Sequence, residues 1–138
     1  MISPDGATLT TIPGTAFVRS FAVAQAGNSI IFTGDSFNIS RVAVDGGPVT
    51  IIATFQASAV QRIVDLSCHD DLCIVLTTDP TPANLPRSTL WRLTLSDGQL
   101  SPIQSFQAIF SSAKLSPVAG DVLMFGPGGL SLYTGLVP

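Results

Sequence analysis

An internal repeat constrains the fold of this chain more than any other feature. Residues 21–35 align without a gap with residues 65–79, and each copy reads as a strand, a tight polar turn, an apolar strand and then Thr-x-Asp. A third copy covers residues 115–128. Because self-similarity at a regular spacing is the sequence signature of repeat architectures, the chain is expected to stack copies of one structural unit.

A second module follows each of the first two copies. Residues 39–49 parallel residues 90–100, and each reads as two short alternating strands joined by Gly46-Gly47 or Asp97-Gly98. Such dipeptides supply the positive backbone φ angles that tight hairpin turns need. Each unit therefore contains four strands, and a four-stranded repeat of about 40–50 residues is typical of a β-propeller blade.

The repeat predicts an all-β fold made of four-stranded antiparallel β-propeller blades, in an incomplete ring of about three. The expected units are residues 1–19 as the last strand of a preceding blade, 20–62 as a blade, 63–113 as a blade with a Pro-rich insertion at 80–86, and 114–138 as a partial terminal blade. Since propellers have at least about four blades, we expect the chain to be the C-terminal part of a larger propeller; the alternative is that two or more copies assemble one. The segment 7–12 could also complete the last sheet.

Composition and charge exclude two classes of partner. Hydrophobic residues make up 46% of the chain, yet the longest apolar runs, at 29–32 and 72–76, are too short to span a bilayer. The net charge is −3, and the six Lys and Arg residues do not form the basic stripe that nucleic acids require. The low Lys content suggests a bacterial source with GC-rich coding.

Cys68 and Cys73 flank the predicted turn of the second hairpin. Facing residues of a short hairpin satisfy the distance that a disulfide needs, which makes a disulfide the favoured interpretation. Free buried thiols and a metal or catalytic role are the alternatives, although Cys-x4-Cys with one histidine is not a zinc spacing. Because disulfides persist in oxidising compartments, the pair predicts an extracytoplasmic protein, periplasmic or secreted.

Other candidate site residues are few. The lone His69 pairs with no nucleophile motif, so a catalytic triad cannot be argued. Asp70 and Asp71 are the first candidates for an ion, but no calcium-binding ladder of aspartates is present, so we expect no metal and no cofactor. Trp91 and Tyr133 lie on third strands, where they pack between blades or, alternatively, form an exposed binding surface with Arg92.

The turn Ser3-Pro4-Asp5-Gly6, the strand-ending Asp35 and Asp79, and the run Leu90-Trp91-Arg92 resemble TolB-type, WD-like β-propeller repeats. In that family the Ser-Pro-Asp-Gly turn usually joins the first two strands, whereas here the alignment places it between the third and fourth. The resemblance implies a propeller with an extracytoplasmic binding or scaffold role, and it implies no reaction.

The expected function is therefore a non-catalytic protein-interaction or structural module of a secreted or periplasmic propeller protein, not an enzyme. Its partner would be another protein or the remaining blades of the same propeller. Two alternatives stay open. One is the non-catalytic part of a propeller-containing enzyme, such as a peptidase or lyase. The other is a self-assembling subunit that forms a homo-oligomer.

Overall fold

The computed structural model describes residues 11–15, 18–24, 27–34, 37–56, 60, 62–78, 87–116 and 120–137. These residues form eleven β-strands in three antiparallel sheets, and they contain no helix. Accordingly, the described part of the chain has no helix that is long and apolar enough to cross a membrane.

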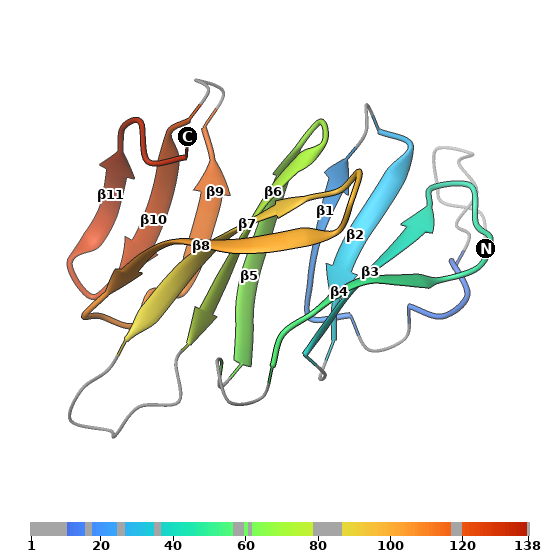
Figure 1. The fold of residues 1–138 in the computed structure, drawn as a ribbon, viewed down its shortest axis with the longest axis horizontal. Coiled ribbons are helices and arrows are strands. Elements are labelled where there is room, and N and C mark those ends of the chain that lie inside the picture. Colours follow the sequence, from blue (N-terminus) through green and yellow to red (C-terminus); the bar gives the residue numbers. More distant parts are fainter. Residues whose placement is uncertain are drawn as a thin grey trace, which may run out of the picture.

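Each sheet joins its strands in sequence order, as an up-and-down meander (Figure 1). The first sheet contains β1 (Ser20–Ala24), β2 (Ser29–Thr33), β3 (Asn38–Ala43) and β4 (Thr50–Thr54). The second contains β5 (Arg62–His69), β6 (Leu72–Thr78), β7 (Ser88–Thr94) and β8 (Gln99–Phe106). The third contains β9 (Ser112–Leu115), β10 (Val122–Gly126) and β11 (Gly129–Tyr133).

The sheets lie side by side, and their first strands meet (Figure 1). Strand β5 contacts β1 on one side and β9 on the other, so the second sheet lies between the other two. We call the face of a sheet that points to the preceding sheet its upstream face, and the opposite face its downstream face. This arrangement leaves the upstream face of the first sheet and the downstream face of the third without a neighbouring sheet among the described residues.

Two apolar clusters hold the sheets together. The cluster between the first and second sheets includes Ile31, Ile39, Leu66, Val75 and Leu93. The cluster between the second and third sheets includes Ile74, Leu76, Leu90, Val122 and Met124. The second sheet is therefore covered on both faces, which explains the continuous burial of β6 from Cys73 to Thr78.

The strand register corrects the gapless hairpin alignment. Ile31 lies opposite Arg41 in the first sheet, and Ile74 lies opposite Arg92 in the second. Ile31 is therefore equivalent to Ile74, and both point downstream, whereas the gapless alignment places Ile31 over Val75. The sequence alignment is therefore wrong by one residue in β2 and by one residue in the opposite direction in β1, where Phe21 is equivalent to Leu66 and not to Asp65.

The physical reason is the length of the hairpin turn. Residues 25–28 separate β1 from β2, but only Asp70 and Asp71 separate β5 from β6. The first turn is two residues longer, so the strands before and after it are each shifted by one residue relative to the repeat, in opposite directions. Because side chains alternate between the faces of a sheet, a one-residue shift assigns every side chain to the wrong face.

One turn glycine is also required by a close approach. Gly98 has a φ of +69°, as the predicted turn between β7 and β8 requires. A Cβ atom at this position would overlap the backbone carbonyl oxygen of Ile52 in β4. The turn of the second sheet therefore packs directly on the backbone of the first.

Several sequence predictions fall outside the described residues. They are the turn at 3–6, the segment 7–10 of the expected N-terminal strand, Asp35, Asp79 and the Pro-rich insertion at 80–86. The division of the chain into blades at residues 19, 62 and 113 also stays a prediction.

Candidate functional site

The two cysteines are joined by a disulfide, the pairing that the sequence favours. Cys68 in β5 lies directly opposite Cys73 in β6, beside the turn that connects the two strands. Both side chains belong to the apolar cluster between the first and second sheets. The disulfide therefore staples the hairpin on its upstream face.

The turn beside the disulfide is polar and open. A hollow of about 290 Å³ is lined there by His69, Asp70, Asp71, Leu72, Arg92 and Thr94. His69 Nε2 lies 3.5 Å from Asp70 Oδ2, and both side chains are largely exposed to solvent. Within the described ranges, no three His, Cys, Asp or Glu side chains gather where they could hold a metal ion. Asp70 and Asp71 therefore remain candidates by residue type alone.

The two aromatic candidates lie in contacts between sheets. The Trp91 ring meets Phe55, which follows β4, edge to face at 5.1 Å between centroids, and its Nε1 donates to Thr77 Oγ1 at 2.8 Å. The Tyr133 ring lies 5.4 Å from that of Phe106, at the end of β8. Both rings thus join neighbouring sheets, and a binding surface formed with Arg92 stays a prediction.

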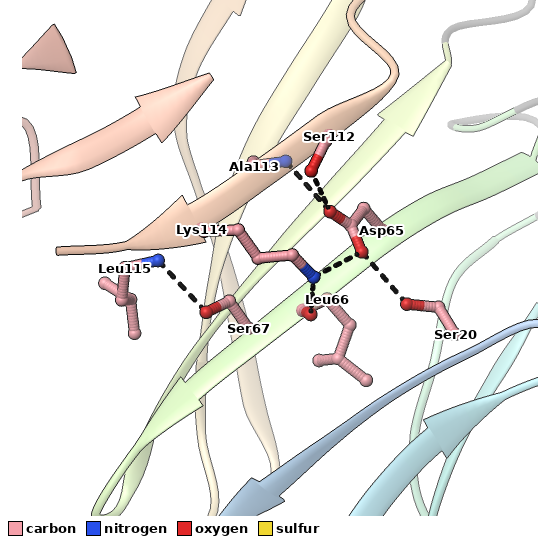
Figure 2. Close-up of polar contacts among 8 residues, drawn as sticks. All are labelled: Ser20, Asp65, Leu66, Ser67, Ser112, Ala113, Lys114 and Leu115. Atoms are coloured by element: carbon pink, nitrogen blue, oxygen red, sulfur yellow. Dashed lines mark hydrogen bonds and ion pairs between the residues drawn. The ribbon is translucent and has the colours of Figure 1, made fainter. Parts of the chain in front are cut away.

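The sequence reasoning missed Asp65, the buried carboxylate of β5 (Figure 2). Its Oδ2 accepts hydrogen bonds from Ser112 Oγ at 2.8 Å and from the Ala113 amide at 2.9 Å. Its Oδ1 lies 3.0 Å from Lys114 Nζ and accepts a hydrogen bond from Ser20 Oγ at 3.0 Å. One side chain therefore binds groups from β1 and β9 at once.

These contacts join equivalent positions of the three first strands. Ser20 and Ser112 begin the pairing of β1 and β9 with their hairpin partners, opposite Thr33 and Phe125, and Asp65 is the first paired residue after the bulge in β5, opposite Leu76. The carboxylate is thus placed at the junction of the sheets, where it fixes their relative position. A second contact nearby, from the Leu115 amide to Ser67 Oγ at 3.0 Å, fixes β9 against β5 in the same way.

The surroundings also set the acidity of this carboxylate. Burial raises the pKa of Asp65, because the charged form loses contact with water. Hydrogen bonds from the Ala113 and Leu66 amides stabilise the charged form, and so do the side chains of Lys114 and Ser112. Together they outweigh burial and hold the pKa of Asp65 below its usual value of 3.8. The carboxylate is ionised and fully engaged in structural contacts.

A second feature missed by sequence reasoning is the apolar upstream face of the first sheet. Phe21 there is 62% exposed, whereas Leu66, at the equivalent position of the second sheet, is completely buried. The face carries Phe21, Val23, Ile30, Phe32, Val42 and Ile51, of which Phe32 and Val42 are buried. A hollow of about 500 Å³ opens on it, lined by Thr11, Ile12, Thr15, Val18, Arg19, Phe21, Ile30 and Phe32.

The downstream face of the third sheet is apolar in the same way. Leu130 is 71% exposed, whereas its equivalent Leu90 is completely buried. Phe125 is 52% exposed, and its equivalent Leu76 is also buried. This face carries Leu123, Phe125, Leu130 and Leu132. We call these two surfaces the upstream end face and the downstream end face.

Most of the exposed large apolar side chains of the described residues lie on the two end faces. Every large hydrophobic side chain that is exposed in this part of the chain belongs to the first or the third sheet or to the β3–β4 hairpin. Contiguous exposed apolar patches mark interaction sites, whereas single exposed hydrophobic residues need no explanation. The end faces are therefore the strongest candidate binding surfaces.

Comparison with solved structures defines the class of fold. The oligogalacturonate lyase of Vibrio parahaemolyticus matches with a TM-score of 0.66 and 12% identity, over 82% of this chain and 36% of that chain. TolB from Acinetobacter baumannii matches with a TM-score of 0.54 and 15% identity, over 85% and 31%. The WD40 repeats of RRP9 match with a TM-score of 0.52 and 12% identity, over 90% and 39%.

These matches establish the fold alone, because the identities are low. The chain folds as β-propeller blades of the TolB and WD-like type, which confirms the predicted fold class. It spans about a third of the length of the solved chains that it resembles. No protein-family model matches the chain, and no curated protein matches it.

Proposed function

We propose that this chain is a non-catalytic structural and protein-interaction module of an extracytoplasmic β-propeller protein, and that it acts through its end faces. The observation that carries the proposal is the contrast in burial at equivalent positions. Positions that are completely buried between sheets, such as Leu66 and Leu90, correspond to exposed Phe21 and Leu130 on the end faces. Burying such exposed apolar side chains against another protein is favourable, because it removes apolar surface from water.

The use of the buried polar groups supports a structural role. Both oxygens of Asp65 are occupied by groups from β1 and β9, so this carboxylate serves the contact between sheets. The ring of Trp91 likewise joins β7 to the segment after β4. The disulfide supports the extracytoplasmic location, since such bonds are rare in reducing compartments.

Site-specific photo-crosslinking tests the interaction role. A benzophenone amino acid would replace Phe21 or Leu130 on the end faces, and Ser101 on the exposed outer strand β8 would serve as the control position. We expect mass spectrometry to identify crosslinked peptides from the blades of this or another propeller polypeptide at the first two positions. Failure of both end-face probes to crosslink to protein would contradict the proposal.

An enzymatic assay tests the non-catalytic part of the proposal against its rival, part of a propeller lyase or peptidase. The purified chain would be incubated with oligogalacturonate and manganese, the ligand of one structural match, and separately with unstructured peptides. We expect no unsaturated uronate product and no cleavage above the buffer control. Turnover that saturates with substrate concentration and follows the protein through purification would overturn the proposal.

A further inference from the structure

Strand β6 differs from every other strand of six or more residues in the described chain. Strands β3, β5 and β7 each contain at least one charged residue, and β8 contains Pro102. The seven residues of β6, Leu72–Thr78, include no charged residue, no proline and no glycine. Uncharged segments of about six or seven residues that favour β-structure are the sequence signature of stacks in which identical strands from many chains pair.

The folded chain keeps β6 out of reach of another copy. Each of its seven residues pairs with β5 on one edge and with β7 on the other (Figure 1). The first and third sheets cover its two faces, so that Val75 and Ile74 are completely buried. All of these contacts come from described residues, so they do not depend on what covers the end faces. Strand β6 therefore becomes available for pairing only when the second sheet opens, during folding or partial unfolding.

Acidic residues flank this apolar strand. Asp70 and Asp71 form the exposed turn directly before β6, and Asp79 follows it in the sequence. Asp70 has a φ of +53°, and among the described residues it alone combines a positive φ with a side chain other than that of glycine. Because glycine adopts such a φ with the least strain, this turn carries a charge at a position where the backbone by itself favours glycine.

We propose that β6 is a self-association segment, that its partner is β6 of a second copy of this chain opened in the same way, and that Asp70 and Asp71 suppress the pairing. In a stack of identical strands, equivalent residues of adjacent copies lie about 4.8 Å apart. Each added copy then brings two more carboxylates next to the two already present. Carboxylates at this distance repel one another, and salt weakens the repulsion. The two aspartates therefore act as gatekeepers, charged residues that flank an apolar strand and oppose its aggregation.

Aggregation kinetics of the purified chain test the proposal. The double variant Asp70→Asn with Asp71→Asn removes both charges, and asparagine tolerates the positive φ at position 70. Asp45→Ser with Asp121→Asn is the matched control, because it removes the same charge from the connections between β3 and β4 and between β9 and β10. Urea is adjusted until the wild type and both double variants are unfolded to the same extent. No reductant is added, so the disulfide stays intact.

The position of the charges should decide the rate. We expect the variant without Asp70 and Asp71 to form thioflavin-binding aggregates at least about tenfold faster than the wild type, since two like-charge contacts per added copy are lost. The control should change the rate by less than about twofold, because its charges lie outside the stack. Added salt should raise the wild-type rate towards that of the first variant, since it screens the repulsion.

The aggregates themselves identify the segment that pairs. Proteolysis followed by mass spectrometry should recover residues 72–78 as the protected core. A core that excludes these residues would overturn the proposal, and so would the absence of aggregates in all three proteins. A control variant that aggregates as fast as the variant without Asp70 and Asp71 would overturn it as well, because net charge alone would then explain the change.

Discussion

Leu76 and Phe125 occupy the same position in neighbouring sheets, but their surroundings differ. Leu76 in the second sheet lies under the third sheet and is completely buried, while Phe125 in the third sheet is 52% exposed. The same comparison holds for Leu90 and Leu130. The repeat therefore places an apolar side chain at this position both where the described residues supply a neighbouring sheet and where they do not.

The largest expected effect comes from placing a charge at Leu76, and the same charge at Phe125 provides the comparison. Leu76→Asp should cost more than about 4 kcal/mol of unfolding free energy, because it buries an unpaired carboxylate. Phe125→Asp should cost less than about 1 kcal/mol, since exposed positions tolerate polar groups. Urea denaturation of the purified chain measures both losses, and equal losses would contradict the comparison.

The next effect concerns the polar junction of the sheets. Asp65→Ala leaves the hydrogen-bond donors of β1 and β9 without their acceptor, and we expect a loss of about 2–3 kcal/mol. Asp45→Ala, in the exposed turn after β3, is the control and should change the unfolding free energy by less than about 0.5 kcal/mol. If the two variants lose the same amount in chemical denaturation, the carboxylate does not hold the sheets together.

A smaller effect is expected at the close approach between the first two sheets. Gly98→Ala should lower the unfolding free energy by about 2 kcal/mol. The new Cβ would overlap the Ile52 carbonyl oxygen, and the positive φ adds backbone strain. Gly46→Ala also has a positive φ, but open space surrounds its Cβ, so we expect about 1 kcal/mol. Thermal unfolding of the two variants separates the cost of the contact with Ile52 from the cost of the positive φ. A larger loss of stability for Gly46→Ala than for Gly98→Ala would rule out the contact.

Loss of the disulfide should matter less than loss of the buried contacts. Replacing Cys68 and Cys73 together by Ala opens a short loop, and the expected cost is at most about 2 kcal/mol. The denaturation midpoint should fall without a change in the slope of the transition. A double variant that cannot fold at all would show that the hairpin depends on the bond rather than on the apolar cluster around it.

The smallest effect is expected in the pH dependence. Because the folded state holds the pKa of Asp65 below 3.8, the charged carboxylate stabilises the fold above the unfolded value, and this stabilisation is lost as the pH falls from about 3.8 through the lower folded value. Wild type should therefore lose more stability than Asp65→Ala as the pH is lowered through this range. Parallel curves for the two proteins in acid denaturation would contradict this assignment.

Much of the fold follows from the sequence. Alternating apolar residues, the turn glycines and the repeat spacing predict the meander sheets, because each of these signals is local. The gapless alignment of β1 and β2 with β5 and β6 failed because it takes no account of the longer turn between β1 and β2. Residue Ile31 illustrates the error, since it points to the second sheet in the structure and away from it in the gapless alignment.

The candidate site was harder to predict than the fold. The partners of Asp65 in β1 and β9 lie 45 to 49 residues away along the chain, so no local pattern predicts them. The available signal was a carboxylate placed between apolar residues, after Ile63 and Val64 and before Leu66, because a buried charge needs hydrogen-bond partners. The end faces could not be predicted for a different reason. In the sequence Phe21 and Leu130 look like core residues, and only the structure shows that no neighbouring sheet covers them among the described residues.

The meander order of the strands has a consequence for how the molecule folds. Each sheet pairs only strands that follow one another in the chain, so its loops close at little entropic cost and it can form soon after synthesis. The bonds of Asp65 span far longer stretches and need all three sheets in place. The bonds of this carboxylate are therefore expected to form late in folding, after the sheets that they join.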